Sequence, residues 1–90
     1  MPYQSPTDFC AKYSKAYNRD IPGGFDQVIT LDEVIIVSET PDTAWVEAVW
    51  WTNGHAPDAG YYEVSERTAF VLVKRHDGWH VHSEENLGYE

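Results

Sequence analysis

The stretch GYYEVSERTAFVLVKRHDGWHVHSEEN, residues 60–86, decides the fold class of this chain. It predicts two long β-strands, at about 61–75 and 79–87, joined by a tight turn at 76–78. That turn contains Asp-Gly, which tolerates the positive φ that short hairpin turns require. Residues 69–73 are continuously apolar, which is typical of a strand covered on both faces. The C-terminal third is therefore expected to form a β-hairpin.

Two further strands are expected upstream of this hairpin, at about 28–39 and 44–52. The first is rich in β-branched residues, which favour a strand over a helix. A Thr-Pro-Asp turn at 40–42 separates the two strands, and the composition of residues 53–60 indicates a loop. In the first strand, regular alternation predicts two faces: Ile29, Leu31, Ile35 and Val37 on one, and Val28, Val34 and Ile36 on the other. In the second strand, Ala44, Val46, Ala48 and Trp50 are expected on one face, and Trp45, Glu47, Val49 and Trp51 on the other.

A short helix is expected before the strands, at about 6–18. Ser5 is a suitable N-cap, Pro6 suits the first helical position, and Asp8 stands where a capping-box acid would stand. Four residues recur at helical spacing and form one apolar stripe: Phe9, Tyr13, Ala16 and Tyr17. Pro-Gly-Gly at 22–24 interrupts the chain after the helix.

The predicted architecture is α+β, with one N-terminal helix packed on a curved four-stranded antiparallel sheet. Consecutive strands with short connections favour an antiparallel meander. The chain has 90 residues, a length typical of one domain, and we expect a single domain over 1–90. Both faces of the sheet carry apolar residues, and one short helix cannot cover both. We therefore expect a homodimer formed through the uncovered sheet face.

The charge balance narrows the range of partners. Six lysines and arginines stand against fifteen aspartates and glutamates, a net charge of −9. Such a field repels phosphate groups, so we expect neither nucleic-acid nor membrane binding. Cys10 is the only cysteine, which excludes an internal disulfide, and it is expected to be a packed thiol. The chain begins without a signal-like apolar segment, and we expect a cytoplasmic protein that needs no cofactor.

Two segments carry a family resemblance, RTAFVLVKR at 67–75 and DGWHVHS at 77–83. A long apolar strand, a charged Asp-Gly turn, a tryptophan and a last strand with histidine resemble the end of a SnoaL-like, NTF2-like (cystatin-like α+β) domain. The resemblance implies a curved sheet around a helix and frequent dimers. Relatives include hydrolases, isomerases, dehydratases, cyclases and binding proteins. Most have several N-terminal helices, whereas this chain has room for one, so it resembles a reduced form.

A histidine near the end of the chain is the candidate general base. The pocket of such domains is often lined by polar residues of the last strands, which is what the resemblance implies for His82. Imidazole accepts a proton near neutral pH. Glu63 and Asp32 are the candidate catalytic carboxylates beside it, with Glu47 and Tyr62 as further partners. The alternative is a half-buried histidine that is hydrogen-bonded to a neighbour.

The same strand contains a pattern that could suit a metal ion. His80, His82 and Glu84 are spaced by two, which places them on one face of a regular strand. Two imidazoles and a carboxylate can bind a transition metal. Such sites usually collect ligands from several elements, so the favoured interpretations are a polar row on one face or a histidine packed and hydrogen-bonded under the helix, and no metal site is expected.

Aromatic residues are numerous for a chain of this length, with four Trp, six Tyr and three Phe. They could line a pocket for a planar or apolar ligand, or form the core and a subunit interface. The candidate ligand-binding residues are Tyr13, Tyr17, Trp50, Tyr62, Phe70, Trp79 and His80. The leading hypothesis is that the domain binds a small apolar or aromatic ligand between helix and sheet. The alternatives are a pocket enzyme (a lyase, isomerase or hydrolase) that uses a histidine–carboxylate pair, and a protein-interaction module.

Overall fold

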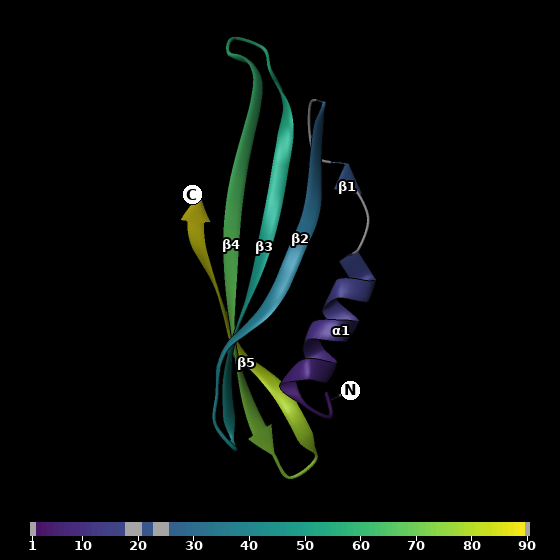
Figure 1. Cartoon of the computed structure of the whole chain (residues 1–90), viewed down its shortest axis with the longest axis vertical. Helices are drawn as coiled ribbons and strands as arrows, with labels where there is room; N and C mark the ends of the chain where they lie inside the picture. Colours follow the sequence, from purple (N-terminus) through teal and green to yellow (C-terminus); the bar gives the residue numbers. More distant parts are fainter. Residues whose placement is uncertain (1, 18–20, 23–25, 90) are drawn as a thin grey trace.

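A computed structural model describes residues 2–17, 21–22 and 26–89. One helix precedes a meander of antiparallel strands whose order in the sheet follows the chain (Figure 1). The elements are α1 (Pro6–Tyr17), β1 (Ile21–Pro22), β2 (Gln27–Glu39), β3 (Thr43–Ala56), β4 (Gly60–Arg75) and β5 (Gly78–Tyr89). The α+β architecture is confirmed, with β1 as a short strand that the sequence did not predict. The predicted last helical residue, Asn18, and the glycines at 23–24 lie outside the described residues.

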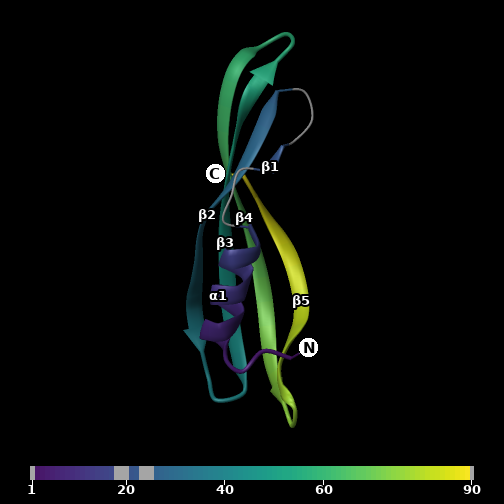
Figure 2. The same ribbon diagram turned by 90° about the vertical axis from the view of Figure 1, so that its right-hand side faces the viewer.

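The sheet is long and twisted, and α1 lies in the concave side of one half of it. In Figure 2 the helix is flanked by β2 on one side and by β5 on the other. The molecule measures 52 × 21 × 16 Å and has a radius of gyration of 15.2 Å. A compact chain of this length would have a radius of about 12 Å. The helix therefore covers only part of one face, and the β3–β4 hairpin extends well beyond it (Figure 1).

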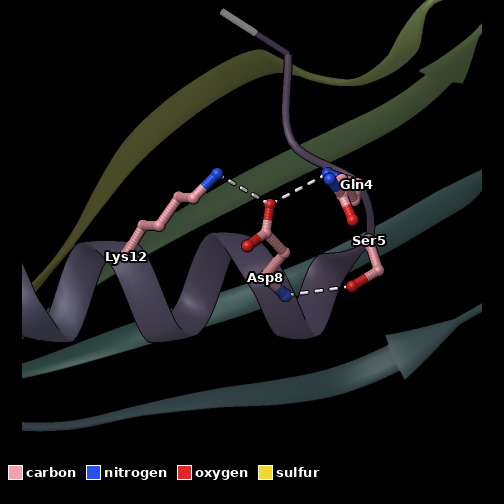
Figure 3. A network of polar contacts seen from close by, with 4 residues as sticks. All are labelled: Gln4, Ser5, Asp8 and Lys12. Atoms are coloured by element: carbon pink, nitrogen blue, oxygen red, sulfur yellow. Dashed lines mark hydrogen bonds and ion pairs between the residues drawn. The ribbon is translucent and has the colours of Figure 1, made fainter.

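The start of α1 is fixed by a reciprocal set of polar contacts (Figure 3). The backbone N–H of Asp8 donates to Ser5 Oγ at 3.0 Å, and the Asp8 carboxylate accepts from the backbone N–H of Gln4 at 2.9 Å. Lys12 Nζ lies 3.1 Å from the same carboxylate, one helical turn on. Ser5 is therefore the N-cap, as the sequence predicted. These contacts also set the direction in which the preceding segment enters α1.

The core lies between α1 and the face of the sheet that it covers, which we call the helix face. Phe9 of α1 is 2% exposed and stacks edge-on against Phe70 of β4, with ring centroids 5.3 Å apart. The predicted alternation of β3 is confirmed, because its even-numbered residues from Ala44 lie on this face. The buried cluster is Phe9, Leu31, Ala44, Val46, Ala48, Phe70, Leu72 and Trp79. Burial of these side chains is the main contribution to the stability of the domain.

The predicted faces of β2 are wrong, because the strand is not regular. Its pairing with β3 shifts between Leu31 and Glu33, so Asp32 is an extra residue in the ladder. A bulge of this kind reverses the alternation that follows it. Leu31 and Val34 therefore share the helix face, and Ile35 is 37% exposed on the opposite face. A second shift, between Ile36 and Ser38, lies near the end of the strand.

The predicted loop at 53–60 is also wrong, because most of it belongs to β3. Pairing between β3 and β4 continues without a shift to Ala56 opposite Gly60, and only residues 57–59 form the connection. Gly60 has φ +77°, which suits a three-residue hairpin loop closed by a glycine. Asn, Gly and His in 53–55 resemble loop residues in composition, but the long β4 strand pairs with them. The predicted turn at 40–42 is confirmed, and the one predicted at 76–78 is confirmed for residues 76–77, because Gly78 already belongs to β5.

Candidate functional site

A cleft with a largely aromatic lining lies on the helix face, between α1 and the edge strand β5. Its volume is about 420 Å³, and we call it the helix cleft. Ring centroids of Tyr13 and Phe70 are 5.2 Å apart, and those of Tyr13 and Tyr17 are 4.9 Å apart. The lining residues are Tyr3, Phe9, Lys12, Tyr13, Ala16, Tyr17, Phe70, Val81 and Glu84. The cleft therefore offers stacked rings together with one ammonium and one carboxylate group.

The phenol of Tyr13 is held in its protonated form within this cleft. Burial, then the neighbouring Tyr17, then the negative charge of Glu84 raise the pKa of Tyr13 to about 12. Trp50 packs beside it, with ring centroids 6.1 Å apart. Because even an unshifted phenol is protonated near pH 7, the raised pKa only extends to higher pH the range in which Tyr13 can donate a hydrogen bond to a ligand.

A second hollow lies on the helix face toward the β3–β4 hairpin, and we call it the hairpin groove. Its larger part has a volume of about 470 Å³ and an adjoining part of about 280 Å³ shares Ile29 and Glu66 with it. Gln27 and Tyr62 close one end, where Gln27 Nε2 donates to the Tyr62 hydroxyl at 2.9 Å. The lining residues are Gln27, Ile29, Trp50, Thr52, Tyr62, Val64, Glu66 and Thr68.

The three candidate catalytic residues are not brought together. His82 is an extra residue in β5, beside Ser83, which pairs with Val71 of β4. Glu63 is eight residues from Val71 along β4, a distance of about 27 Å at the usual rise per residue. Asp32 lies two strands from β4, in the bulge of β2. All three side chains are exposed. No histidine–carboxylate pair of the predicted kind is formed by these residues.

The predicted common face of His80, His82 and Glu84 is wrong. The pairing of β4 with β5 shifts at His82, so Glu84 lies opposite Phe70 on the helix face while His80 lies opposite Val73 on the other face. His80 Nε2 instead lies 2.7 Å from a carboxylate oxygen of Asp77 in the adjacent turn. Among the described residues, no group of three or more His, Cys, Asp or Glu side chains could hold a metal ion.

The candidate ligand-binding residues fall into four places. Tyr13, Tyr17 and Phe70 line the helix cleft, whereas Trp50 and Tyr62 line the hairpin groove. Trp79 is 5% exposed and belongs to the core, where its backbone pairs with that of Tyr3 at 2.7 and 2.9 Å. His80 lies on the opposite face of the sheet. Three of the seven residues are therefore brought to one cleft.

The face of the sheet opposite α1, the outer face, carries apolar side chains around one ion pair. Arg67 Nη1 lies 3.1 Å from Glu47 Oε1, and Trp45 Nε1 donates to the other oxygen of Glu47 at 2.7 Å. Apolar residues surround this pair: Ile35, Val49, Trp51, Ala69, Val71 and Val73. In the sequence analysis Glu47 was only a possible partner of His82. Its position two residues from Trp45, on the same face of a strand, was the signal for this contact.

Glu66 and Glu84 were not predicted to belong to the two hollows. Each hollow contains one of them beside aromatic side chains. Glu66 could have been found from alternation along β4, because Tyr62, Val64 and Glu66 share a face. Glu84 could not, since the shift at His82 changes which side of β5 it occupies.

Comparisons of this chain with models of known protein families, with curated proteins and with solved structures gave no match in any of the three. The resemblance to NTF2-like domains therefore stays a prediction. In the part of the chain that the structure describes, no helix is long and apolar enough to cross a membrane. The cytoplasmic location also stays a prediction.

Proposed function

We propose that this protein is a reduced NTF2-like domain that binds a small apolar or aromatic molecule in the helix cleft. The main support for this proposal is the lining of the cleft. Its volume is about 420 Å³, and the aromatic rings of Tyr13, Tyr17 and Phe70 line it beside the helix. Binding sites for small molecules are typically concave and mostly apolar, with few polar groups. The helix in the concave side of a curved antiparallel sheet supports the family assignment.

The polar groups of the cleft favour a ligand with a hydrogen-bonding edge. The Tyr13 hydroxyl is protonated at neutral pH, as an ordinary tyrosine also is, and can donate a hydrogen bond. Lys12 and Glu84 also line the cleft. A planar molecule with one polar edge could stack on the rings and reach the Tyr13 hydroxyl. Indole is a suitable probe, since it is neutral, planar and has one N–H group.

Filling the cleft tests this proposal. Ala16 lines the cleft, and Ala16→Trp would occupy it from the exposed side of α1, whereas Ala11→Trp adds the same side chain at an exposed helix position outside the lining. We expect indole to shift amide NMR signals of residues around the cleft, with binding at least tenfold weaker in Ala16→Trp and unchanged in Ala11→Trp. Equal indole affinity in the two variants would refute the cleft as the site.

An enzymatic function has less support from the geometry. The candidate base His82 is about 27 Å from Glu63 along the sheet, too far for a proton to pass directly between them. Cys10 packs against the core, and burial raises the pKa of its thiol, which disfavours the reactive thiolate. We therefore propose a binding protein.

A second proposed property is self-association through the outer face. Trp51 and Ile35 on this face are 38% and 37% exposed, and apolar sheet faces commonly pack against another sheet about 10 Å away. We expect a symmetric dimer at micromolar concentration in sedimentation experiments. Trp51→Lys should give a monomer, whereas Val81→Lys, which makes the same charge change at a residue of β5 that is 43% exposed on the helix face, should not. A monomeric wild type would contradict this property.

A further inference from the structure

The hairpin groove is built from three successive rows of side chains across β2, β3 and β4. Gln27, Gly54 and Tyr62 pair in the first row, Ile29, Thr52 and Val64 in the second, and Leu31, Trp50 and Glu66 in the third. The rows run from Tyr62 to Glu66, a span of about 14 Å at the usual rise per residue. Gly54 contributes no side chain, and in this row Gln27 Nε2 donates to the Tyr62 hydroxyl at 2.9 Å, which closes the groove at this end. The groove is therefore polar at one end, apolar in the middle and acidic at the other.

The acidic end has the composition of a site for an organic cation. The Glu66 carboxylate lies in the same row as the Trp50 indole, and aromatic faces attract ammonium groups. None of the described residues that line the groove is lysine or arginine. The net charge of −9 raises the local concentration of cations and repels anions.

The Glu66 carboxylate is held in place by the end of β5. Asn86 Nδ2 donates to Glu66 Oε1, and the Oδ1 atom of the same amide accepts from the backbone N–H of Gly88 at 2.7 Å. The second contact fixes which edge of the Asn86 amide faces the carboxylate. Among the described contacts, Glu66 Oε2 has no protein partner. It could therefore accept a hydrogen bond from a ligand without displacing Asn86.

We propose that the hairpin groove binds a small primary arylalkylamine. Its ammonium group contacts Glu66 and Trp50, its ring packs on Ile29 and Val64, and a polar group at the far end meets the hydrogen-bonded pair of Gln27 and Tyr62. This site lies on different residues from the helix cleft, and its ligand differs in charge from the neutral molecule proposed there. Trp50 of the groove also contacts Tyr13 and Tyr17 of the cleft, with ring centroids 6.1 and 5.6 Å apart, so the two sites are separated by the charge of the ligand and by the Glu66 and Ala16 variants.

Three ligands of similar size separate charge from shape. Tyramine carries an ammonium group and a phenol, 4-ethylphenol lacks the charge, and 4-hydroxyphenylacetate carries a negative charge. Titration of the isotope-labelled 90-residue chain followed by amide NMR reports both affinity and position. We expect tyramine to shift residues of the three rows and to bind about tenfold more tightly than 4-ethylphenol. 4-Hydroxyphenylacetate should show no saturable binding, because the acidic groove repels its carboxylate.

Two variants with the same charge change separate the groove from the general field of the protein. Glu66→Gln removes the carboxylate in the groove and keeps an oxygen that can accept from Asn86. Glu63→Gln removes a carboxylate three residues away on the outer face of the same strand. We expect tyramine to bind Glu66→Gln about tenfold more weakly and Glu63→Gln as the wild type. Binding to Ala16→Trp should also be unchanged.

Three results would overturn the proposal. One is equal affinity for tyramine and 4-ethylphenol, because the carboxylate would then have no role. Another is equal weakening in Glu63→Gln and Glu66→Gln, which would mean a diffuse charge effect. The third is a tyramine response confined to the helix cleft and lost in Ala16→Trp. That last result would leave the proposed cleft function intact, so the two proposals fail separately.

Discussion

Asp8 shows how one residue can link the segment that precedes α1 to the first turns of the helix. Its backbone N–H donates to Ser5, and its carboxylate accepts from the N–H of Gln4 and pairs with Lys12. The hydrogen bond from Gln4, then that from Lys12, lowers the pKa of Asp8 below its usual 3.8. A depressed carboxyl pKa means that the ionised form stabilises the folded state. This contribution is present above pH 3.8 and is lost as the pH falls through the lower folded pKa.

Two variants of this cap should respond differently to pH. Ser5→Ala removes an uncharged acceptor, so it should lower the free energy of unfolding by about 1 kcal/mol at every pH. Asp8→Asn removes a charge, so its destabilisation should be seen at pH 6 and should fade as the pH falls through the lowered pKa of Asp8, where the wild-type carboxyl becomes protonated. Thermal unfolding followed by circular dichroism measures both. Asp58→Asn, in the exposed β3–β4 turn, is the charge control. A destabilisation of Asp8→Asn that persists at low pH would contradict the assigned role of the charge.

At the scale of elements, strand existence could be predicted from the sequence but strand regularity could not. The β-branched run of β2 and the Asp-Gly turn of the last hairpin are local signals, and both gave the correct element. The bulges at Asp32 and His82 depend on how two strands pair, and no residue type near them requires a bulge. Each extra residue exchanges the faces of everything beyond it. The predicted common face of His80, His82 and Glu84 failed for this reason.

Two glycines of the β3–β4 hairpin should respond to alanine for different reasons. Gly60 has φ +77° and open space around it, so Gly60→Ala should cost about 1 kcal/mol for backbone conformation alone. A Cβ at Gly54 would lie 2.7 Å from the backbone oxygen of Asp26, so Gly54→Ala must displace the start of β2. We expect Gly54→Ala to cost at least twice as much in urea unfolding. Gly60→Asn should recover part of the loss, since asparagine tolerates positive φ. Equal costs would mean that β2 and β3 are not packed closely at this point.

At the scale of the whole molecule, shape and charge oppose each other. An elongated sheet with one helix leaves the outer face open, and its apolar residues favour contact with a second copy. Each copy carries a charge of −9, which disfavours that contact. Glu47 and Arg67 compensate each other at the centre of the outer face, so the repulsion comes from charges around the interface and not from its middle. The negative charge was evident from the composition and the apolar outer face from the strand pattern, whereas the central ion pair became evident only from the register of β3 and β4.

Salt should therefore strengthen the proposed dimer. Facing sheets would lie about 10 Å apart, whereas the Debye length is about 30 Å at 10 mM salt and about 8 Å at 150 mM. Repulsion between two copies is thus nearly unscreened at 10 mM and largely screened at 150 mM, and apolar contact is not weakened by this change. We expect the dimer dissociation constant from sedimentation to fall at least tenfold between these concentrations. The Trp51→Lys variant should remain monomeric at both. A dissociation constant that rises with salt would show that the copies associate through complementary charges, and the apolar outer face would then not be the interface.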